Sequence, residues 1–424
     1  MSKIVIVGGG WGGVSAALCA SNFDVEIVLL EKTDRLLGTG LVGGIMRNNG
    51  RYTAAEELIA LGGGRLVELC DKNATHKDVS FPGHSHATLY NVIKVAQQID
   101  GILREKNISI MYKSRAVKVN MEGSRLKGLV LDSGECIEGD VFVDATGTGG
   151  PMVNCRKYGH GCVMCVLRCP TFGGRSSITA KVGVKERPAR NRDNSIGAMS
   201  GACELVPETI HPDLLDTLKK KGFVKIPLPK QLGLINLNRK VCQQYSRKEY
   251  SNNLILLDTG YVKMMASYLP LNILNSLPGL ERAEYKDPYS GGVGNSIRFV
   301  ERCPMDASLK VKGTENLYVA GEKAGLLVGH TEAMVTGALA GYNCVRHVND
   351  LKPLTLPPSL ALGDIILHAI QLQDSDIMNG TRLTFSGSMY FEKMKDKGLY
   401  TTDVDVIKSR VESTGLENIF TYLP

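Results

Sequence analysis

The feature that most constrains the fold is a glycine-rich turn between a short apolar strand and a helix of small residues. Residues 3–7 (Lys-Ile-Val-Ile-Val) are typical of a buried parallel strand, and residues 14–19 predict a helix. Between them, residues 8–13 read Gly-Gly-Gly-Trp-Gly-Gly and match G-x-G-x-x-G. In that pattern the first glycine permits a tight turn, the second admits a pyrophosphate and the third packs helix against strand. The sequence therefore predicts an α/β unit that binds a dinucleotide at a helix N-terminus.

An acidic residue at the end of the next strand supports the same interpretation. Residues 25–30 (Val-Glu-Ile-Val-Leu-Leu) predict a second strand, which completes a βαβ unit, and Glu31 follows it. A carboxylate at this position accepts hydrogen bonds from an adenosine ribose. The cofactor-binding residues predicted from this unit are Gly8, Gly10, Trp11, Gly12, Gly13, Glu31 and Lys32.

Two later segments resemble the second and last cofactor strands of FAD enzymes of the glutathione-reductase structural class. They are residues 141–147 (Val-Phe-Val-Asp-Ala-Thr-Gly) and residues 316–322 (Asn-Leu-Tyr-Val-Ala-Gly-Glu). The resemblance implies FAD rather than NAD, with Glu322 bonded to the ribityl chain. It also implies that a helix opened by residues 329–332 (Gly-His-Thr-Glu) points its positive end at the flavin. The further cofactor residues are Gly40, Val117, Ala145, Thr146, Gly147, Gly321, Glu322, His330, Thr331 and Glu332.

Within the broad FAD-dependent oxidoreductase family, the C-terminal half is most similar to the folate- and FAD-dependent tRNA uridine methyltransferases and the GidA-type flavoproteins. Residues 277–285 (Leu-Pro-Gly-Leu-Glu-Arg-Ala-Glu-Tyr), 337–343 (Gly-Ala-Leu-Ala-Gly-Tyr-Asn) and 356–363 (Leu-Pro-Pro-Ser-Leu-Ala-Leu-Gly) carry this resemblance. It implies a flavoenzyme fold but does not fix the substrate, because folds host many functions.

The fold class that we predict is α/β, with more than one core because the chain has 424 residues. A Rossmann-like FAD-binding domain of the glutathione-reductase type is expected over 1–150 and 301–355. An inserted α+β substrate domain is expected over 151–300, where the pattern changes, and a mainly helical region over 356–424. Locally, the periodicity predicts helices over 88–106 and 332–345 and strands over 108–119 and 126–133.

Four cysteines follow the second cofactor strand within fifteen residues. Cys155, Cys162, Cys165 and Cys169 have the spacing C-x6-C-x2-C-x3-C, and Pro170 follows the last. Four soft thiolates in one short loop favour a [4Fe-4S] cluster. Three alternatives stay open at this point: a redox-active disulfide between Cys162 and Cys165, a zinc site, and plain buried thiols. Zinc ligands usually form two widely separated pairs, which this spacing does not match.

Composition and charge limit the remaining possibilities. Basic residues exceed acidic ones by 50 − 43 = 7, which favours anionic ligands but does not establish nucleic-acid binding. Part of this surplus falls in residues 181–192, which a solvated loop explains more simply than an RNA-binding segment does. The N-terminus enters a strand at once, so we expect no signal peptide, and no apolar run is long enough for a membrane span. Eleven cysteines without an export signal indicate a cytoplasmic protein.

These observations predict an enzyme, and the first hypothesis is a flavin-dependent oxidoreductase. It couples a [4Fe-4S] cluster to FAD, takes electrons from a ferredoxin-like donor and acts on a small-molecule or RNA substrate. The alternative is a flavin-dependent tRNA- or rRNA-modifying enzyme, methyltransferase-like in character. A third hypothesis is a non-catalytic FAD-binding protein with a structural metal clamp. A homo-oligomer is compatible with the sequence.

No catalytic acid, base or nucleophile is identified from the sequence. Two histidines in a polar loop and three cysteines outside the four-cysteine segment are the remaining candidates, and each has a plain structural alternative. They are His84, His86, Cys203, Cys242 and Cys303.

Overall fold

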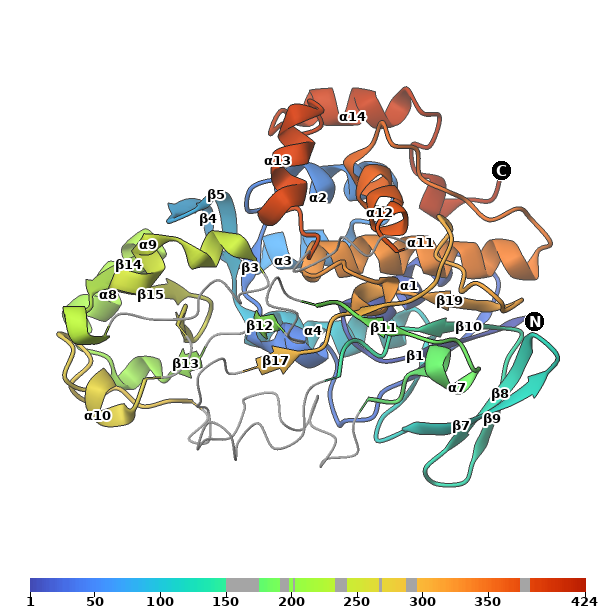
Figure 1. The fold of residues 1–424 in the computed structure, drawn as a ribbon, viewed down its shortest axis with the longest axis horizontal. Helices are drawn as coiled ribbons and strands as arrows, with labels where there is room; N and C mark the ends of the chain where they lie inside the picture. Colours follow the sequence, from blue (N-terminus) through green and yellow to red (C-terminus); the bar gives the residue numbers. More distant parts are fainter. Residues whose placement is uncertain are drawn as a thin grey trace.

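A parallel five-stranded sheet forms the centre of the described structure (Figure 1). The computed structural model describes residues 1–149, 175–190, 198–200, 203–232, 242–266, 269–286, 296–373 and 382–424. The sheet has the order β19-β10-β1-β2-β6, and each neighbouring pair is parallel. Its strands are β1 (Lys3–Val7), β2 (Glu26–Leu30), β6 (Ser109–Met111), β10 (Val141–Asp144) and β19 (Leu317–Val319). Because the strands are parallel, the loops after β1, β2, β10 and β19 meet at one edge of the sheet.

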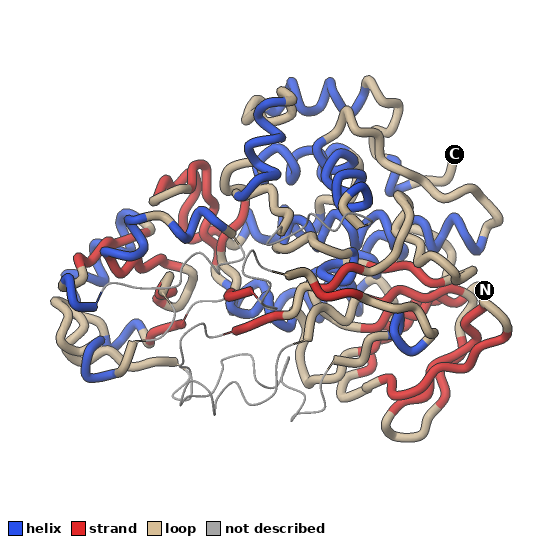
Figure 2. The backbone as a smooth tube through the Cα atoms, viewed as in Figure 1, coloured by secondary structure: helices blue, strands red, loops and turns tan. Residues whose placement is uncertain are grey.

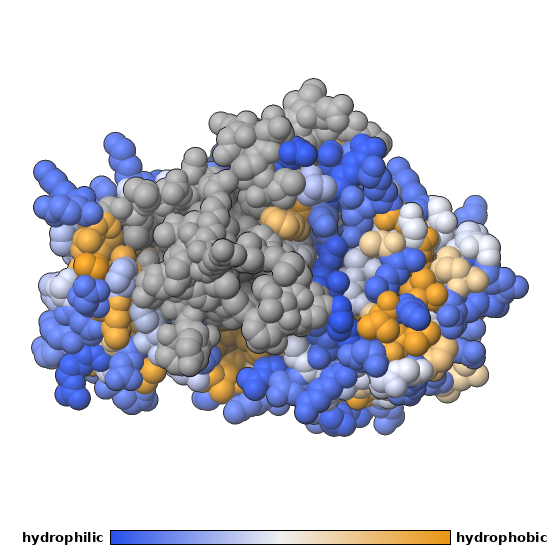
Figure 3. Space-filling model, turned by 60° about the horizontal axis from the view of Figure 1, so that its bottom comes forward, coloured by the Kyte–Doolittle hydropathy of each residue, from blue (hydrophilic) through white to orange (hydrophobic). Residues whose placement is uncertain are grey.

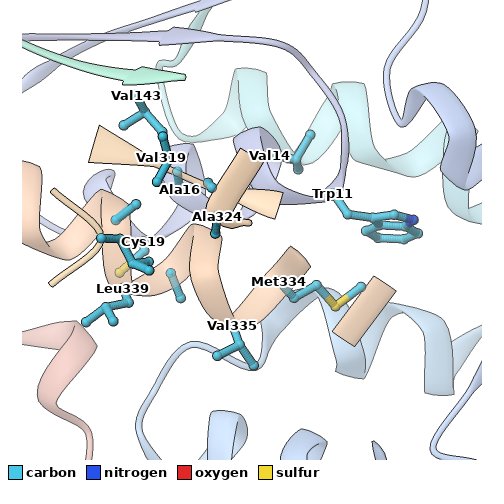
Figure 4. Close-up of a cluster of buried hydrophobic side chains, with 14 of the residues drawn as sticks. Trp11, Val14, Ala16, Cys19, Val143, Val319, Ala324, Met334, Val335 and Leu339 are labelled. Atoms are coloured by element: carbon cyan, nitrogen blue, oxygen red, sulfur yellow. The ribbon is translucent and has the colours of Figure 1, made fainter. Parts of the chain in front are cut away.

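Two helices of small residues pack against each other beside this sheet, α1 (Trp11–Ala20) and α11 (His330–Val348). Figure 4 shows the buried cluster to which both helices contribute: Ala16 and Cys19 of α1 lie between Val143 and Val319 of the strands and Leu339 of α11. A Cβ atom added to residue 341 would lie 2.2 Å from the carbonyl oxygen of Ala16, and one added to residue 337 would lie 2.2 Å from that of residue 12. Only glycine at these positions permits so close a contact between the two helices, which fixes the start of α1 against α11.

The segment between β2 and β10 contains two small antiparallel sheets. One has the order β3-β5-β4 and the other has the order β7-β8-β9, a meander at the lower right of Figure 1. Their strands are β3 (Ile45–Met46), β4 (Ala74–Phe81), β5 (His84–Tyr90), β7 (Ala116–Glu122), β8 (Arg125–Leu131) and β9 (Cys136–Glu138). The helical elements of this segment are η1 (Gly38–Val42), α2 (Arg51–Ala60), α3 (Arg65–Lys72) and α4 (Val92–Glu105).

Two local predictions in this segment are right about the kind of element and wrong about its bounds. The helix expected over 88–106 begins only at Val92, because residues 84–90 form β5 and the Asn91 side chain accepts hydrogen bonds from the backbone N–H groups of Ile93 and Lys94. The strand expected over 108–119 is two strands in different sheets, since β6 pairs with β2 and β7 pairs with β8. Apolar periodicity alone does not detect either change of direction.

A second sheet lies at the left of Figures 1 and 2, away from the parallel sheet. It is antiparallel and has the order β13-β16-β15-β14. A separate apolar core is built from its strands together with the helices and loops around them. Its strands are β13 (Cys203–Leu205), β14 (Phe223–Pro227), β15 (Asn253–Asp258) and β16 (Val262–Met264). The helices around it are η3 (Pro207–Thr209), α8 (Pro212–Lys221), η4 (Lys230–Leu232), η6 (Gln243–Ser246), α9 (Lys248–Asn252) and α10 (Leu271–Leu274).

Two short strand pairs lie between the parallel and antiparallel sheets in Figure 1. β11 (Arg187–Pro188) pairs with β18 (Glu301–Arg302), and β12 (Ala198–Ser200) pairs with β17 (Ser296–Arg298). The nearby helical elements are α7 (Ile178–Lys181) and η7 (Gly321–Ala324).

The C-terminal region is mainly helical and packs on α2 at the top of Figure 1. Its helices are α12 (Ala361–Gln371), α13 (Ser388–Asp396), α14 (Val404–Glu412) and η8 (Ile419–Thr421). The fully buried carboxylate of Glu57 accepts hydrogen bonds from the backbone N–H groups of Ala361 and Leu362, at 3.0 and 3.1 Å. A side chain of α2 therefore caps the N-terminus of α12 and holds the C-terminal helices against the main core.

The surface and the helix lengths bear on membrane association. On the face shown in Figure 3, apolar residues are scattered among hydrophilic ones. Among the helices described, none combines the length and the apolar character that crossing a membrane requires. The domain boundaries at 150, 300 and 355 stay predictions.

Candidate functional site

A cavity opens where the loops after the parallel strands meet. Its walls come from the glycine turn after β1, the residues after β2, β10 and β19, the start of α11 and part of the antiparallel sheet. The predicted cofactor residues that line it are Gly8, Gly10, Trp11, Gly12, Glu31, Lys32, Ala145, Thr146, Gly147, Gly321, Glu322 and His330. The other five, Gly13, Gly40, Val117, Thr331 and Glu332, do not line it.

The glycine turn has the shape that its sequence requires. Gly8 has φ +109°, and a Cβ atom there would lie 2.4 Å from the carbonyl oxygen of Ala145. A Cβ atom on Gly13 would lie 1.9 Å from the carbonyl oxygen of Gly8, so Gly13 serves the packing of α1 rather than the cavity wall. A Cβ atom on Gly10 would meet nothing within 4 Å, and α1 begins next to it without a side-chain cap. The N-terminus of α1 is thus open to an anionic group.

Glu31 connects the end of β2 to this turn. Its carboxylate accepts hydrogen bonds from the backbone N–H of Gly9 and from both the N–H and the hydroxyl of Thr33, at 2.8 to 2.9 Å. The residue is 5% exposed and lines the cavity. Burial lowers the pKa of the adjacent Lys32, which also faces the cavity. Glu31 is therefore held in place by hydrogen bonds at the end of β2, in a part of the wall that also includes the basic side chains Lys32 and Arg115.

The loops after β10 and β19 form the middle of the cavity. The hydroxyl of Thr146 donates to Asp144 at 2.6 Å, and the hydroxyl of Thr148 donates to Glu322 at 2.5 Å. Thr148 follows β10 and Glu322 follows the neighbouring strand β19, so this hydrogen bond fixes the orientation of the Glu322 side chain. The sequence pattern identified Thr146 and Glu322 separately, whereas the link through Thr148 follows only from the fold.

A cluster of buried charged side chains contacts Asp144, at the end of β10. The Lys323 ammonium lies 3.6 Å from Asp144, donates to Ser177 at 2.9 Å and forms an ion pair with Glu186. Burial lowers the pKa of Lys323 to about 7. Burial alone would raise the pKa of Asp144, but Lys323 and the hydrogen bonds that Asp144 accepts hold that pKa below its usual range. Asp144 also accepts a hydrogen bond from the backbone N–H of Thr146 at 3.1 Å, which connects the cluster to the loop after β10.

The start of α11 forms another part of the cavity wall, next to the glycine turn. Gly329 and His330 line it, and the His330 ring lies 5.8 Å from the Trp11 ring. Thr331 and Glu332 are buried behind them. Gly40 packs against Trp11, where an added Cβ atom would lie 2.2 Å from the indole nitrogen. Val117 adjoins Ala116, which does line the cavity. These residues thus support the wall without forming it.

Several wall residues were not predicted as cofactor residues. They come from α2, the region of η6, β16 and the segment before α13, and no local motif marks them. They include Arg51, Tyr245, Lys263, Met265 and Thr384, and also Cys242, which the sequence named only as a nucleophile candidate. The Lys263 ammonium donates to the backbone carbonyls of Val42 and Gly43.

The nucleophile and histidine candidates lie in different surroundings. Cys242 lines the cavity with its sulfur 3.5 Å from the Ser386 hydroxyl, and burial raises the pKa of its thiol. Cys203 and Cys303 are buried outside the cavity lining. His84 is buried against Asn48, and desolvation lowers its pKa to about 3, so its ring is neutral at pH 7. His86 pairs with Asp78 at the surface.

The four cysteines Cys155, Cys162, Cys165 and Cys169 lie outside the described residues. Among the residues that are described, no group of three or more His, Cys, Asp or Glu side chains is arranged to hold a metal ion. The two flanks of the cysteine segment do meet: Arg175 donates to the carbonyl oxygen of Gly147 at 2.8 Å, and both residues line the cavity.

Comparison with known proteins identifies the family. The family model described as Glucose inhibited division protein A matches residues 3–251 and 251–352. The chain belongs to the GidA family. The structure of GidA from Aquifex aeolicus in its form II crystal superposes with a TM-score of 0.70 at 15% identity, covering 97% of this chain and 72% of that one. Its form I crystal gives a TM-score of 0.62. The GidA fold is thereby shown, including the predicted parallel α/β sheet.

Curated relatives of this GidA-family chain carry the name tRNA uridine 5-carboxymethylaminomethyl modification enzyme MnmG. The protein of Borrelia garinii subsp. bavariensis is 23% identical over 416 residues, which cover 83% of this chain and 64% of that protein. The protein of Chlorobium phaeobacteroides is 22% identical over 432 residues, 88% of this chain and 67% of that protein. The chain thus spans about two thirds of the length of these relatives. Their names favour the alternative function, a tRNA-modifying enzyme, over the iron–sulfur oxidoreductase.

Proposed function

We propose that this GidA-family chain binds FAD in the cavity and takes part in the modification of a uridine in tRNA. The observation that carries the proposal is the cavity itself, because it joins the glycine turn, Glu31 and the start of α11 at one edge of a parallel sheet. Family membership and the names of the relatives supply the substrate class.

The residues present fit FAD. The basic wall residues outnumber the acidic ones, which suits a ligand with a pyrophosphate; they are Lys32, Arg51, Arg115, Arg175 and Lys263 against Glu31 and Glu322. The open space beside Gly10 is where a phosphate would approach the N-terminus of α1. The indole N–H of Trp11 is buried and has no hydrogen-bond partner among the described residues, which leaves it available to a cofactor oxygen.

Each part of the cofactor has a candidate partner along the cavity. Glu31 would accept hydrogen bonds from the adenosine ribose, the N-terminus of α1 would hold the pyrophosphate and Glu322 would bind the ribityl chain. The isoalloxazine ring would then lie toward Gly329 and Lys263. When bound, FAD supplies two-electron chemistry, whereas the chain orients the ring and excludes water.

The wall that faces the ring end comes from the antiparallel sheet and the region of η6. Cys242, Tyr245, Lys263 and Met265 line it, so this second sheet would present the substrate to the flavin. Outside the cavity, the exposed Lys219, Lys220 and Lys221 at the end of α8 and the exposed basic residues of 181–190 offer contacts to phosphates. These positions are consistent with a polyanionic substrate.

The test uses the whole chain with FAD and unmodified tRNA. We expect tRNA binding that weakens steeply as salt is raised, since phosphate contacts release counterions. We also expect that cells lacking this protein lose one uridine modification, measured by nucleoside mass spectrometry, and regain it when the chain is restored. Salt-insensitive or absent tRNA binding, together with an unchanged nucleoside profile, would refute the tRNA function.

A [4Fe-4S] cluster held by Cys155, Cys162, Cys165 and Cys169 is a second proposal, favoured by one specific observation. The residues on either side of the cysteine segment, Thr148 and Ser176, both line the cavity. Such a cluster would exchange electrons with the flavin and would accept them from a ferredoxin-like donor. Anaerobically purified protein should contain iron and acid-labile sulfide, and a Cys165→Ser variant should lose them while it keeps FAD. Protein without iron or sulfide would dismiss the cluster and leave the FAD proposal standing.

A further inference from the structure

We propose that the buried ion pair of Arg51 and Glu332 places a positive charge at the flavin-ring end of the cavity and thereby sets the reduction potential of bound FAD. The inference rests on the FAD binding proposed above. It assigns Arg51 to the cavity wall and Glu332 to a positioning role behind it.

The location follows from the direction of the cavity. FAD is a linear molecule with adenosine, pyrophosphate, ribityl chain and ring in that order. Because Glu31 and the glycine turn form the adenosine end, the ring must lie toward the opposite end. The contacts indicate which residues lie there: Glu31 bonds to Gly9 at the start of the turn, whereas Trp11 at its far side lies beside His330. Gly329, the residue before His330, packs against Arg51, which bonds to Thr384.

The contacts hold Arg51 in one orientation. Its Nε lies 3.3 Å from Glu332 Oε1 and its Nη2 lies 3.2 Å from Glu332 Oε2. Nη2 also donates to the Thr384 hydroxyl at 3.1 Å. Glu332 is 1% exposed and accepts further hydrogen bonds from the Thr384 hydroxyl and the backbone N–H of Phe385, both at 2.7 Å. A guanidinium fixed by so many groups cannot swing away from the wall.

The cation and its counter-ion differ in what they face. Arg51 lines the cavity and Glu332 does not. Both pack directly against Gly329, the residue before α11, where an added Cβ atom would lie 2.0 Å from Arg51 Nη2 and from Glu332 Oε2. Gly329 also has φ +141°, a conformation that side chains rarely adopt. The positive end of α11 and the guanidinium therefore act on the same end of the cavity.

The ion pair should affect the reduction potential of the flavin in opposite directions when either partner loses its charge, which a purely structural role would not produce. Flavin reduction adds negative charge to the ring, so a nearby buried cation favours it and a buried anion opposes it. Loss of the Arg51 charge should lower the reduction potential, whereas loss of the Glu332 charge should raise it. A simple loosening of the site would move both variants in the same direction.

The experiment compares Arg51→Gln and Glu332→Gln with wild type, all reconstituted with FAD. Two readouts are the midpoint potential of the bound flavin and its affinity for sulfite, which adds to the oxidised ring and prefers a positive environment. We expect Arg51→Gln to weaken sulfite binding about tenfold and Glu332→Gln to strengthen it, with a tenfold change corresponding to about 30 mV in a two-electron couple. The matched control is Arg410→Gln, which breaks a buried pair with Glu57 away from the cavity and should shift neither readout.

The outcomes separate this inference from the proposed function. Wild-type protein that binds no FAD would refute the proposed function itself. Variants that bind FAD but show no shift, or shifts of the same sign, would overturn the Arg51–Glu332 inference alone. If Arg51→Gln does not fold, Thr384→Val removes a donor to Glu332 without changing charge, and it should lower the potential by a smaller amount. An unchanged potential in that variant would equally overturn the inference.

Discussion

The contact between α1 and α11 positions the glycine turn, and the substitution Gly341→Ala tests it. An alanine Cβ at this position would lie 2.2 Å from the carbonyl oxygen of Ala16 and 2.8 Å from its backbone carbons. Alanine gains about 1 kcal/mol over glycine in a helix interior. Overpacking costs about 1–3 kcal/mol and occasionally more, and a clash with rigid backbone belongs at the upper end. We therefore expect a net loss of about 2 kcal/mol or more.

The assay is thermal unfolding of the two forms, followed by circular dichroism and by dye binding. The matched control is Gly101→Ala, because Gly101 lies in α4 and an added Cβ atom there meets nothing within 4 Å. That variant should gain about 0.5–1 kcal/mol from helix propensity alone. Gly341→Ala should thus melt below wild type and Gly101→Ala at or above it. A Gly341→Ala protein as stable as the Gly101→Ala protein would refute the close-packing argument.

Three further predictions follow from individual side chains. Glu31→Gln should weaken FAD binding about tenfold in equilibrium titration. The control Glu26→Gln, at an exposed position of β2, should leave the FAD affinity unchanged. Equal FAD affinities of the two variants would show that Glu31 does not contact the cofactor. Burial raises the pKa of Glu57 to about 7, so between about pH 4.5 and 7 the folded state holds a proton that the unfolded state has released. The stability of wild type relative to Glu57→Gln should therefore fall as the pH rises through this range. A difference in melting temperature that does not change with pH would contradict this. At pH 7 iodoacetamide should label the exposed Cys136 well before the buried Cys242, as read by peptide mass spectrometry, and early labelling of Cys242 would contradict its raised thiol pKa.

The parts of the fold that sequence could predict are those with a local cause. Neighbouring residues are enough to predict the strand at 3–7, the glycine turn and the second strand, because backbone sterics and helix–strand packing act over a few positions. The resemblance to FAD enzymes extended this to residues 141–147 and 316–322, and the structure brings all of them to one sheet edge. The helix predicted over 332–345 lies within α11, which begins at His330.

The parts that sequence could not predict depend on contacts between distant segments. Arg51 and Glu332 are 281 residues apart and meet only because α2 packs near the start of α11. Lys263 lies in β16 of the antiparallel sheet, lines the cavity and donates to the carbonyl of Gly43, which is 220 residues away in the sequence. Arg51 and Lys263 lie in no motif that was recognised, and each has the ordinary alternative of a surface charge. Glu332 was predicted from the segment 329–332, but its ion pair with Arg51 was not. The start of α4 was missed for a smaller reason, since one capping side chain, Asn91, decides it.

The central claim is that the cavity beside the glycine turn holds FAD, and the most direct measurement is the amount of FAD bound per chain in wild type and in Gly10→Val. Gly10 has φ −73°, and an added Cβ atom there meets no protein atom within 4 Å, so the valine should fit the protein without a clash. It would instead fill the space in which the pyrophosphate approaches the backbone. We predict about one FAD per wild-type chain and no bound FAD in Gly10→Val. Before FAD is added, the two proteins should have the same melting temperature. A folded Gly10→Val protein that binds FAD as wild type does would contradict the account.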